Sequence, residues 1–141
     1  MSYIGKTNNN PQKYLYFRTQ ATDGSDDGTG ESALFPVSSI TGMQPTNDAE
    51  LTIYFKSMLR GSGNEGAGDA LVNLDNNDAV ILTIPVNTHL VAMTAIINAV
   101  NSTSSANVIV VANDDSGGTE YLNNSGITAC GTISVSVAYA N

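Results

Sequence analysis

The stretch from residue 78 to residue 113 constrains the fold most, because it encodes two strands separated by a helix. Its outer pieces, residues 79–85 and 107–112, are dense in β-branched side chains and bounded by Asp, Asn, Pro and Ser, which is typical of strands. A right-handed crossover through the helix would make these two strands parallel neighbours in one sheet. We therefore expect strand, helix, strand at the centre of the fold.

The helix is predicted over about residues 88–102. Apolar side chains three or four residues apart are expected to form its buried face, with Ile96 beside them: Leu90, Met93, Ile97 and Val100. A side-chain oxygen of Thr88 or Asn87 is expected to cap the first helical turn.

Strand-like alternation recurs elsewhere, at residues 13–20, 50–59, 70–74 and 131–141. Residues 33–45 are expected to be extended, with Pro36 confining them to a sheet edge. The chain is thus predicted to be a β-rich α+β protein, an antiparallel or mixed sheet or sandwich of five to seven strands with one helix packed on it. Because the polar face of the last strand carries no charge, we expect a partner or a closed sheet to cover it.

With 141 residues, the chain has the length of one domain, here residues 13–141, preceded by an extended N-terminal arm at residues 1–12. The arm has little apolar material beyond Tyr3 and Ile4, so it is expected to lie on another surface, either its own domain or, as we prefer, a neighbouring subunit. Tyr14 and Tyr16 add amphipathic aromatic area nearby. The predicted interface residues are therefore Tyr3, Ile4, Tyr14 and Tyr16, although the tyrosines could equally cover their own sheet.

Charge and cysteine content exclude several classes of protein. The net charge is −8 and the five basic residues are scattered, which argues against direct nucleic-acid binding. The single Cys130 excludes a disulfide framework and a cysteine-rich zinc site, and is expected to be a small buried residue. No apolar run approaches the roughly twenty residues of a membrane span, and no signal-peptide pattern appears, so a soluble protein made in the cytoplasm is expected.

Motifs for chemistry are weak. Asp23, Asp27 and Glu31 lie in a Gly- and acid-rich loop whose start matches a calcium loop, but Leu34 stands where that motif needs its last carboxylate, so a solvated hairpin loop is the alternative. His89 has no companion at useful spacing and is expected to be structural or exposed. Turn chemistry accounts for the acidic pair at residues 114–115. We expect no catalytic residues and no cofactor.

Several segments together resemble small virion proteins of marine, cyanophage-type tailed bacteriophages. The resemblance is carried by MSYIGK at the start, ELTIYF, VILTIP, THLVAMTAIINAVNST, VIVVANDD and ITACGTISVSV, and is strongest over residues 50–137. The loops at residues 21–32 and 61–69 are not covered by it.

The resemblance implies a virion structural protein that is not an enzyme, most simply a capsid decoration protein that binds the major capsid lattice and forms a homo-oligomer, with a trimer expected by analogy. It would be made in the host cytoplasm and located in the virion. Two alternatives stay open. One is a tail-tube or head–tail joining subunit, whose acidic charge would help DNA slide past. The other is a calcium-dependent carbohydrate-binding module that uses the acidic loops at residues 23–31 and 113–115.

Overall fold

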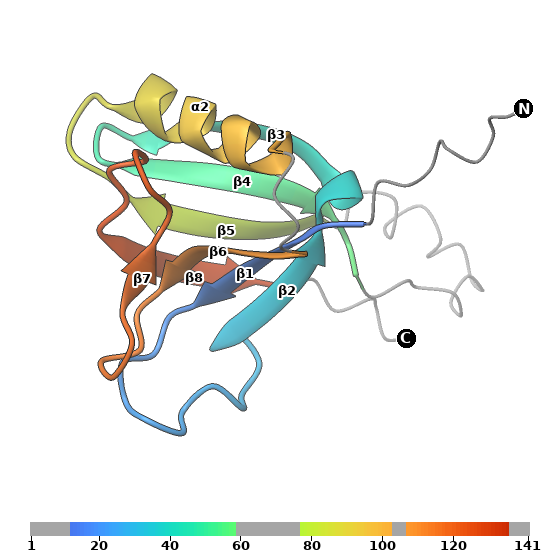
Figure 1. Ribbon diagram of the computed structural model, residues 1–141, viewed down its shortest axis with the longest axis vertical. Coiled ribbons are helices and arrows are strands. Elements are labelled where there is room, and N and C mark those ends of the chain that lie inside the picture. The colour runs from blue at the N-terminus through green and yellow to red at the C-terminus, as the bar shows by residue number, and fades with distance from the viewer. Residues whose placement is uncertain (1–11, 59–76, 103–106, 136–141) are drawn as a thin grey trace, which may run out of the picture.

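The structure is a computed structural model that describes residues 12–58, 77–102 and 107–135. In these ranges the chain forms two four-stranded sheets and one α-helix (Figure 1). Sheet A has the order β2-β1-β6-β7 and consists of β1 (Tyr14–Arg18), β2 (Ser32–Pro36), β6 (Val108–Asn113) and β7 (Glu120–Tyr121). Sheet B has the order β3-β4-β5-β8 and consists of β3 (Ile40–Asn47), β4 (Glu50–Lys56), β5 (Asn77–Thr83) and β8 (Ala129–Ser134). The prediction of a β-rich mixed sandwich with one helix is confirmed.

All pairings are antiparallel except that of β1 with β6, which is parallel. Because β5 lies in sheet B and β6 in sheet A, the predicted parallel pairing of these two strands is wrong. The helix α2 (His89–Val100) contacts β3, β4 and β6. Because α2 lies at the side of the sandwich, between the sheets, the crossover carries the chain from sheet B to sheet A instead of returning it to the same sheet.

The core lies between the two sheets and is centred on all three phenylalanines of the chain. Phe35 and Phe55 stack with ring centroids 4.1 Å apart, and Phe17 meets each of them edge-on at 6.0 Å. Phe17 and Phe35 come from sheet A and Phe55 from sheet B, so the cluster joins the sheets directly. All three rings are fully buried. Edge-on and offset aromatic pairs add to the free energy of burial, by about 0.5–1.5 kcal/mol per pair.

The helix packs on the core through small residues. Its buried side chains are Ala92, Ala95 and Ile96, and Met93 and Val100 are partly buried against the core, so three of the five apolar residues predicted for the inner face lie there. Leu90 and Ile97, which were also predicted to be buried, are 75% and 43% exposed. Two alanines on the inner face bring the helix backbone close to the strands, so the buried stripe is rotated from the one that the large residues predict.

The predicted side-chain cap of the helix is also wrong. Thr88 is the N-cap residue but makes no side-chain cap hydrogen bond, and its hydroxyl donates instead to the carbonyl oxygen of Pro85, 2.7 Å away. Asn87 adopts a positive φ of 63°, which shapes the turn that leads into α2.

The described residues contain eight strands where five to seven were expected. The predicted extended segment 33–45 is divided by a short 3-10 turn, Val37–Ser39, into one strand of each sheet. Pro36 ends β2, which is an edge strand as predicted, because proline lacks the N–H that an inner strand needs. The predicted strand at 70–74, most of the arm and residues 136–141 lie outside the described residues.

Candidate assembly surface

The outer face of sheet A carries a continuous apolar patch. The register of β1 with its two neighbours places Tyr14 between Pro36 and Val108, and Tyr16 between Leu34 and Val110. We call these six residues the outer patch: Tyr14, Tyr16, Leu34, Pro36, Val108 and Val110. Leu15 and Phe17 alternate with them along β1 and are fully buried in the core, so the outer patch faces away from it.

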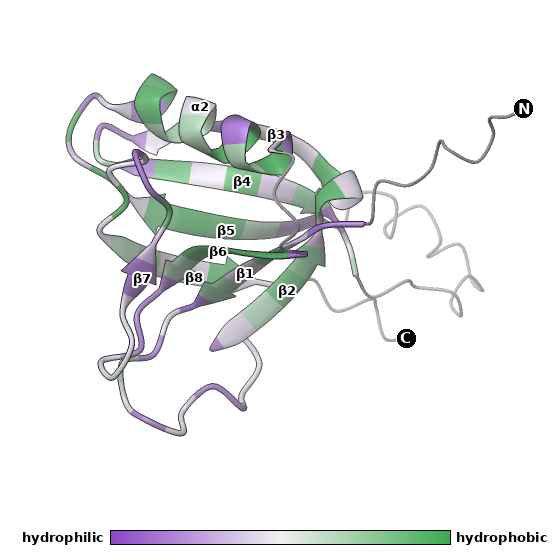
Figure 2. Cartoon of the chain, viewed as in Figure 1, coloured by the Kyte–Doolittle hydropathy of each residue, from purple (hydrophilic) through white to green (hydrophobic). Residues whose placement is uncertain are grey.

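The outer patch is partly exposed and contains no charged side chain. Leu34 is 44% exposed and Val108 is 48% exposed, and the other four residues are half-buried. Figure 2 shows β6 mostly in the apolar colour beside β1 and β2. In a protein with a net charge of −8, such a surface is the kind that a partner can cover without desolvating charges.

Arg18, the last residue of β1, holds the β1–β2 loop to the end of sheet A. Its Nε donates to the carbonyl oxygen of Gln20 and its second terminal nitrogen to that of Thr22, both at 2.9 Å. The remaining terminal nitrogen lies 3.3 Å from Asp26 and 3.7 Å from Asp115. Only 6% of Arg18 is exposed, so the guanidinium joins this acidic loop to the next one.

The calcium candidates lie in this loop. Glu31 accepts a hydrogen bond from the backbone N–H of Gly28 at 2.9 Å, which curls the loop back on itself. Asp23 and Asp27 are exposed. Across the described ranges, no three His, Cys, Asp or Glu residues gather closely enough to hold a metal ion. The geometry is that of a hairpin loop between β1 and β2.

The acidic turn after β6 joins the two sheets through Asp114. One carboxylate oxygen accepts a hydrogen bond from the Tyr121 hydroxyl at 2.5 Å, and both oxygens accept from the backbone N–H of Cys130 in β8, at 3.1 and 3.2 Å. Burial, and then the charge of Asp114, raise the pKa of the Cys130 thiol to about 12. Burial, and then the hydrogen bond to Asp114, raise the pKa of Tyr121 to about 12. The carboxylate is thus occupied in holding sheet A to sheet B.

His89 has a structural contact. Its Nε2 lies 2.8 Å from the carbonyl oxygen of Asn47 and 3.0 Å from that of Glu50. With its proton on Nε2, the imidazole donates to both oxygens and fixes the start of α2 on the β3–β4 turn.

A second apolar surface lies on the outer side of α2. Leu90, Val91 and Ile97 are 75%, 51% and 43% exposed. The sequence of this helix, HLVAMTAIINAV, contains no Asp, Glu, Lys or Arg. The two surfaces face different directions, so they can be tested separately.

Of the interface residues predicted from sequence, the structure places Tyr14 and Tyr16 together on the outer patch, whereas Tyr3 and Ile4 lie outside the described residues. The other members of the patch, Leu34, Pro36, Val108 and Val110, were missed. Alternation along β1 already pointed the two tyrosines to one face. The neighbours of β1 could not be read from sequence, because β6 lies far along the chain and reaches β1 only after the crossover.

No family model, curated protein or solved structure matches the chain. Among the residues that the structure describes, no helix is long and apolar enough to span a membrane.

Proposed function

We propose that the protein is a non-enzymatic structural subunit of a bacteriophage virion, a capsid decoration protein whose outer patch binds the major capsid lattice. The observation that carries the proposal is the charge-free outer patch on an otherwise acidic protein. The segments that resemble virion proteins, among them VIVVANDD in β6, support the same assignment.

The contacts of the ionisable side chains support a structural role. Asp114 bonds to Tyr121 and Cys130, Arg18 holds the loops, and His89 binds backbone carbonyls. Each of them stabilises the fold where it stands. A trimer at a lattice axis is the oligomer that we propose by analogy.

The test compares two leucines on different faces. Expanded capsids of a phage that encodes this chain are mixed with the full chain, with Leu34→Glu and with Leu90→Glu, and bound protein is measured by co-sedimentation. Both side chains are substantially exposed, so both variants are expected to fold. Leu34→Glu places a charge in the outer patch and should weaken binding at least tenfold, while Leu90→Glu should bind as the unchanged chain does.

Undiminished binding by Leu34→Glu would refute the assignment of the outer patch. Loss of binding by Leu90→Glu alone would move the interface to the helix. A tail-tube subunit must polymerise without a capsid, so rings or tubes formed by the purified chain would favour that alternative.

A further inference from the structure

The edge of β6 that faces away from β1 is only partly paired. β7 pairs with Ala112 and Asn113, and Leu122 donates its N–H to the carbonyl oxygen of Val111 at 3.0 Å. Within the described ranges, no strand pairs with Val108 to Val110 on this side. The chain at 122–124 turns away just where a longer β7 would have continued along β6.

The backbone groups on this edge follow from the parallel ladder. Tyr14 donates its N–H to the carbonyl oxygen of Asn107 at 2.8 Å, and β1 pairs in register with Val108 to Val110. In a parallel pair, the N–H and C=O of one residue point to the same edge of the strand, and those of the next residue point to the opposite edge. Ile109 therefore bonds to β1, and the N–H and C=O of Val108 and Val110 point to the open edge. Such an edge is a template for an added strand.

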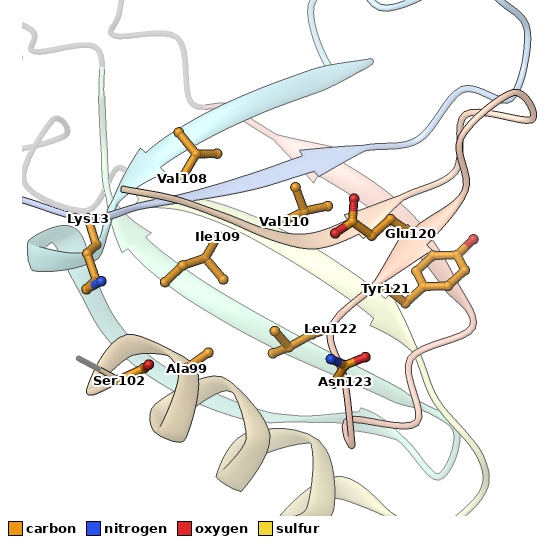
Figure 3. Close-up of a pocket in the computed structure, with 10 residues that line it drawn as sticks. All are labelled: Lys13, Ala99, Ser102, Val108, Ile109, Val110, Glu120, Tyr121, Leu122 and Asn123. Atoms are coloured by element: carbon orange, nitrogen blue, oxygen red, sulfur yellow. The ribbon is translucent and has the colours of Figure 1, made fainter. Parts of the chain in front are cut away.

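A groove of about 510 Å³ lies along this edge, between β6 and the C-terminal end of α2. Figure 3 shows Ile109 pointing toward Ala99 of the helix, with Leu122 and Asn123 closing the groove beyond them. Val108 and Val110 point to the opposite side of the strand. Lys13 lines one end of the groove, and Glu120 lines the other. An added strand would place alternate side chains in this groove.

We propose that this groove binds the N-terminal segment, residues 1–11, of a second copy of the chain as an added strand on β6. The segment carries one basic residue, Lys6, and no acidic residue. The remaining four basic and thirteen acidic residues give the rest of the chain a net charge of −9. The segment is therefore complementary in charge to the body of another copy, and Tyr3 and Ile4 supply its apolar contacts.

A second copy is favoured over the chain's own segment for a topological reason. The segment joins β1 at the same end of sheet A at which the connection from α2 enters β6. To reach the open edge, a chain's own segment would have to cross that connection, and such crossings are avoided in protein folds. Eleven extended residues span up to about 36 Å, which is enough to reach a neighbouring molecule.

Disulfide trapping tests this directly with full-length chains. Ile4→Cys in one chain is mixed with Asn123→Cys in another under mild oxidation, and covalent dimers are counted by mass spectrometry under denaturing conditions. Asn123 is exposed and lines the groove, whereas the control position Thr132 is exposed on β8 in sheet B. We expect at least ten times more heterodimer with Asn123→Cys than with Thr132→Cys.

Equal trapping at both positions would overturn the proposal. So would a double variant, Ile4→Cys with Asn123→Cys, that closes only within one molecule at low concentration. Because no capsid is present, this result is independent of the capsid-binding test.

A complementation experiment gives a second measurement. Ala99→Glu obstructs the groove, and Tyr3→Ser with Ile4→Ser removes the apolar side chains of the segment. Each full-length variant alone should dissociate at a concentration at least tenfold higher than the unchanged chain, as measured by sedimentation. An equimolar mixture should form heterodimers, since one partner keeps an intact groove and the other an intact segment. An unchanged chain that is monomeric at all concentrations would refute the proposal.

Discussion

Replacing Asp114 with alanine tests whether one carboxylate holds the two sheets together. The change removes the acceptor for the backbone N–H of Cys130, which lies in a buried part of β8, and for the hydroxyl of Tyr121. A hydrogen bond to a charged group contributes about 1.5–3 kcal/mol, and we take only about 1 kcal/mol for the bond from Tyr121, because that bond is partly exposed to solvent. We therefore expect the free energy of unfolding to fall by about 2–4 kcal/mol.

Urea unfolding followed by circular dichroism measures this loss. Asp114→Asn keeps one oxygen acceptor and should fall between the unchanged chain and alanine. Asp27→Ala is the matched control, because it removes an exposed carboxylate of the same charge and should change stability by less than about 0.5 kcal/mol. If Asp114→Ala unfolds at the same urea concentration as Asp27→Ala, the carboxylate does not join the sheets and the reasoning fails.

Two further predictions concern β8. Gly131→Ala should lower stability by about 1–3 kcal/mol by urea unfolding, because a Cβ there would lie 2.8 Å from the carbonyl oxygen of Ile81; unchanged stability would contradict this close approach. The pKa of the Cys130 thiol rises from 9.0 to about 12 on folding, so the folded state holds the proton longer than the unfolded state. The stability due to this group is complete below pH 9 and is lost as the pH rises toward 12, at about 1.4 kcal/mol per pH unit. Unfolding at pH 9 and 10.5 should show a loss of about 2 kcal/mol from this thiol, and a Cys130→Ala chain with the same alkaline slope would show that the thiol is not responsible.

Local patterns in the sequence predicted the elements well. Alternation identified the strand that became β1, with Leu15 and Phe17 inward and the tyrosines outward, and the same argument identified β4. Pro36 marked an edge strand because its missing N–H has the same consequence in any sheet. These signals depend on neighbours in the chain, so no partner strand had to be known.

Features that depend on distant partners were predicted poorly. The buried face of α2 was predicted only in part: Ile96 is buried as expected, but Leu90 and Ile97 are exposed. Large apolar side chains were assumed to face the core, whereas close packing also places Ala92 and Ala95 there. The strands predicted at 79–85 and 107–112 were paired because they flank one helix, but the second of them, β6, pairs with β1 instead. The role of Asp114 was missed for the same reason, since Cys130 meets it only when the sheets pack.

The outer patch followed in part from sequence. Tyr14 and Tyr16 were selected as contact residues from alternation and aromatic content, and the structure adds the four aliphatic neighbours that make a continuous surface. Whether another chain covers that surface is the central claim of the account.

Covalent labelling of exposed tyrosines measures this cover most directly. The full chain is labelled free in solution and again when bound to expanded capsids, and modification is quantified residue by residue. Tyr14 and Tyr16 should become protected on the capsid, while Tyr54, which is half-buried in sheet B and accepts a hydrogen bond from the Gln44 side chain, should be labelled equally in both states. Equal labelling of Tyr14 and Tyr16 in the two states would contradict the claim that another chain covers the outer patch.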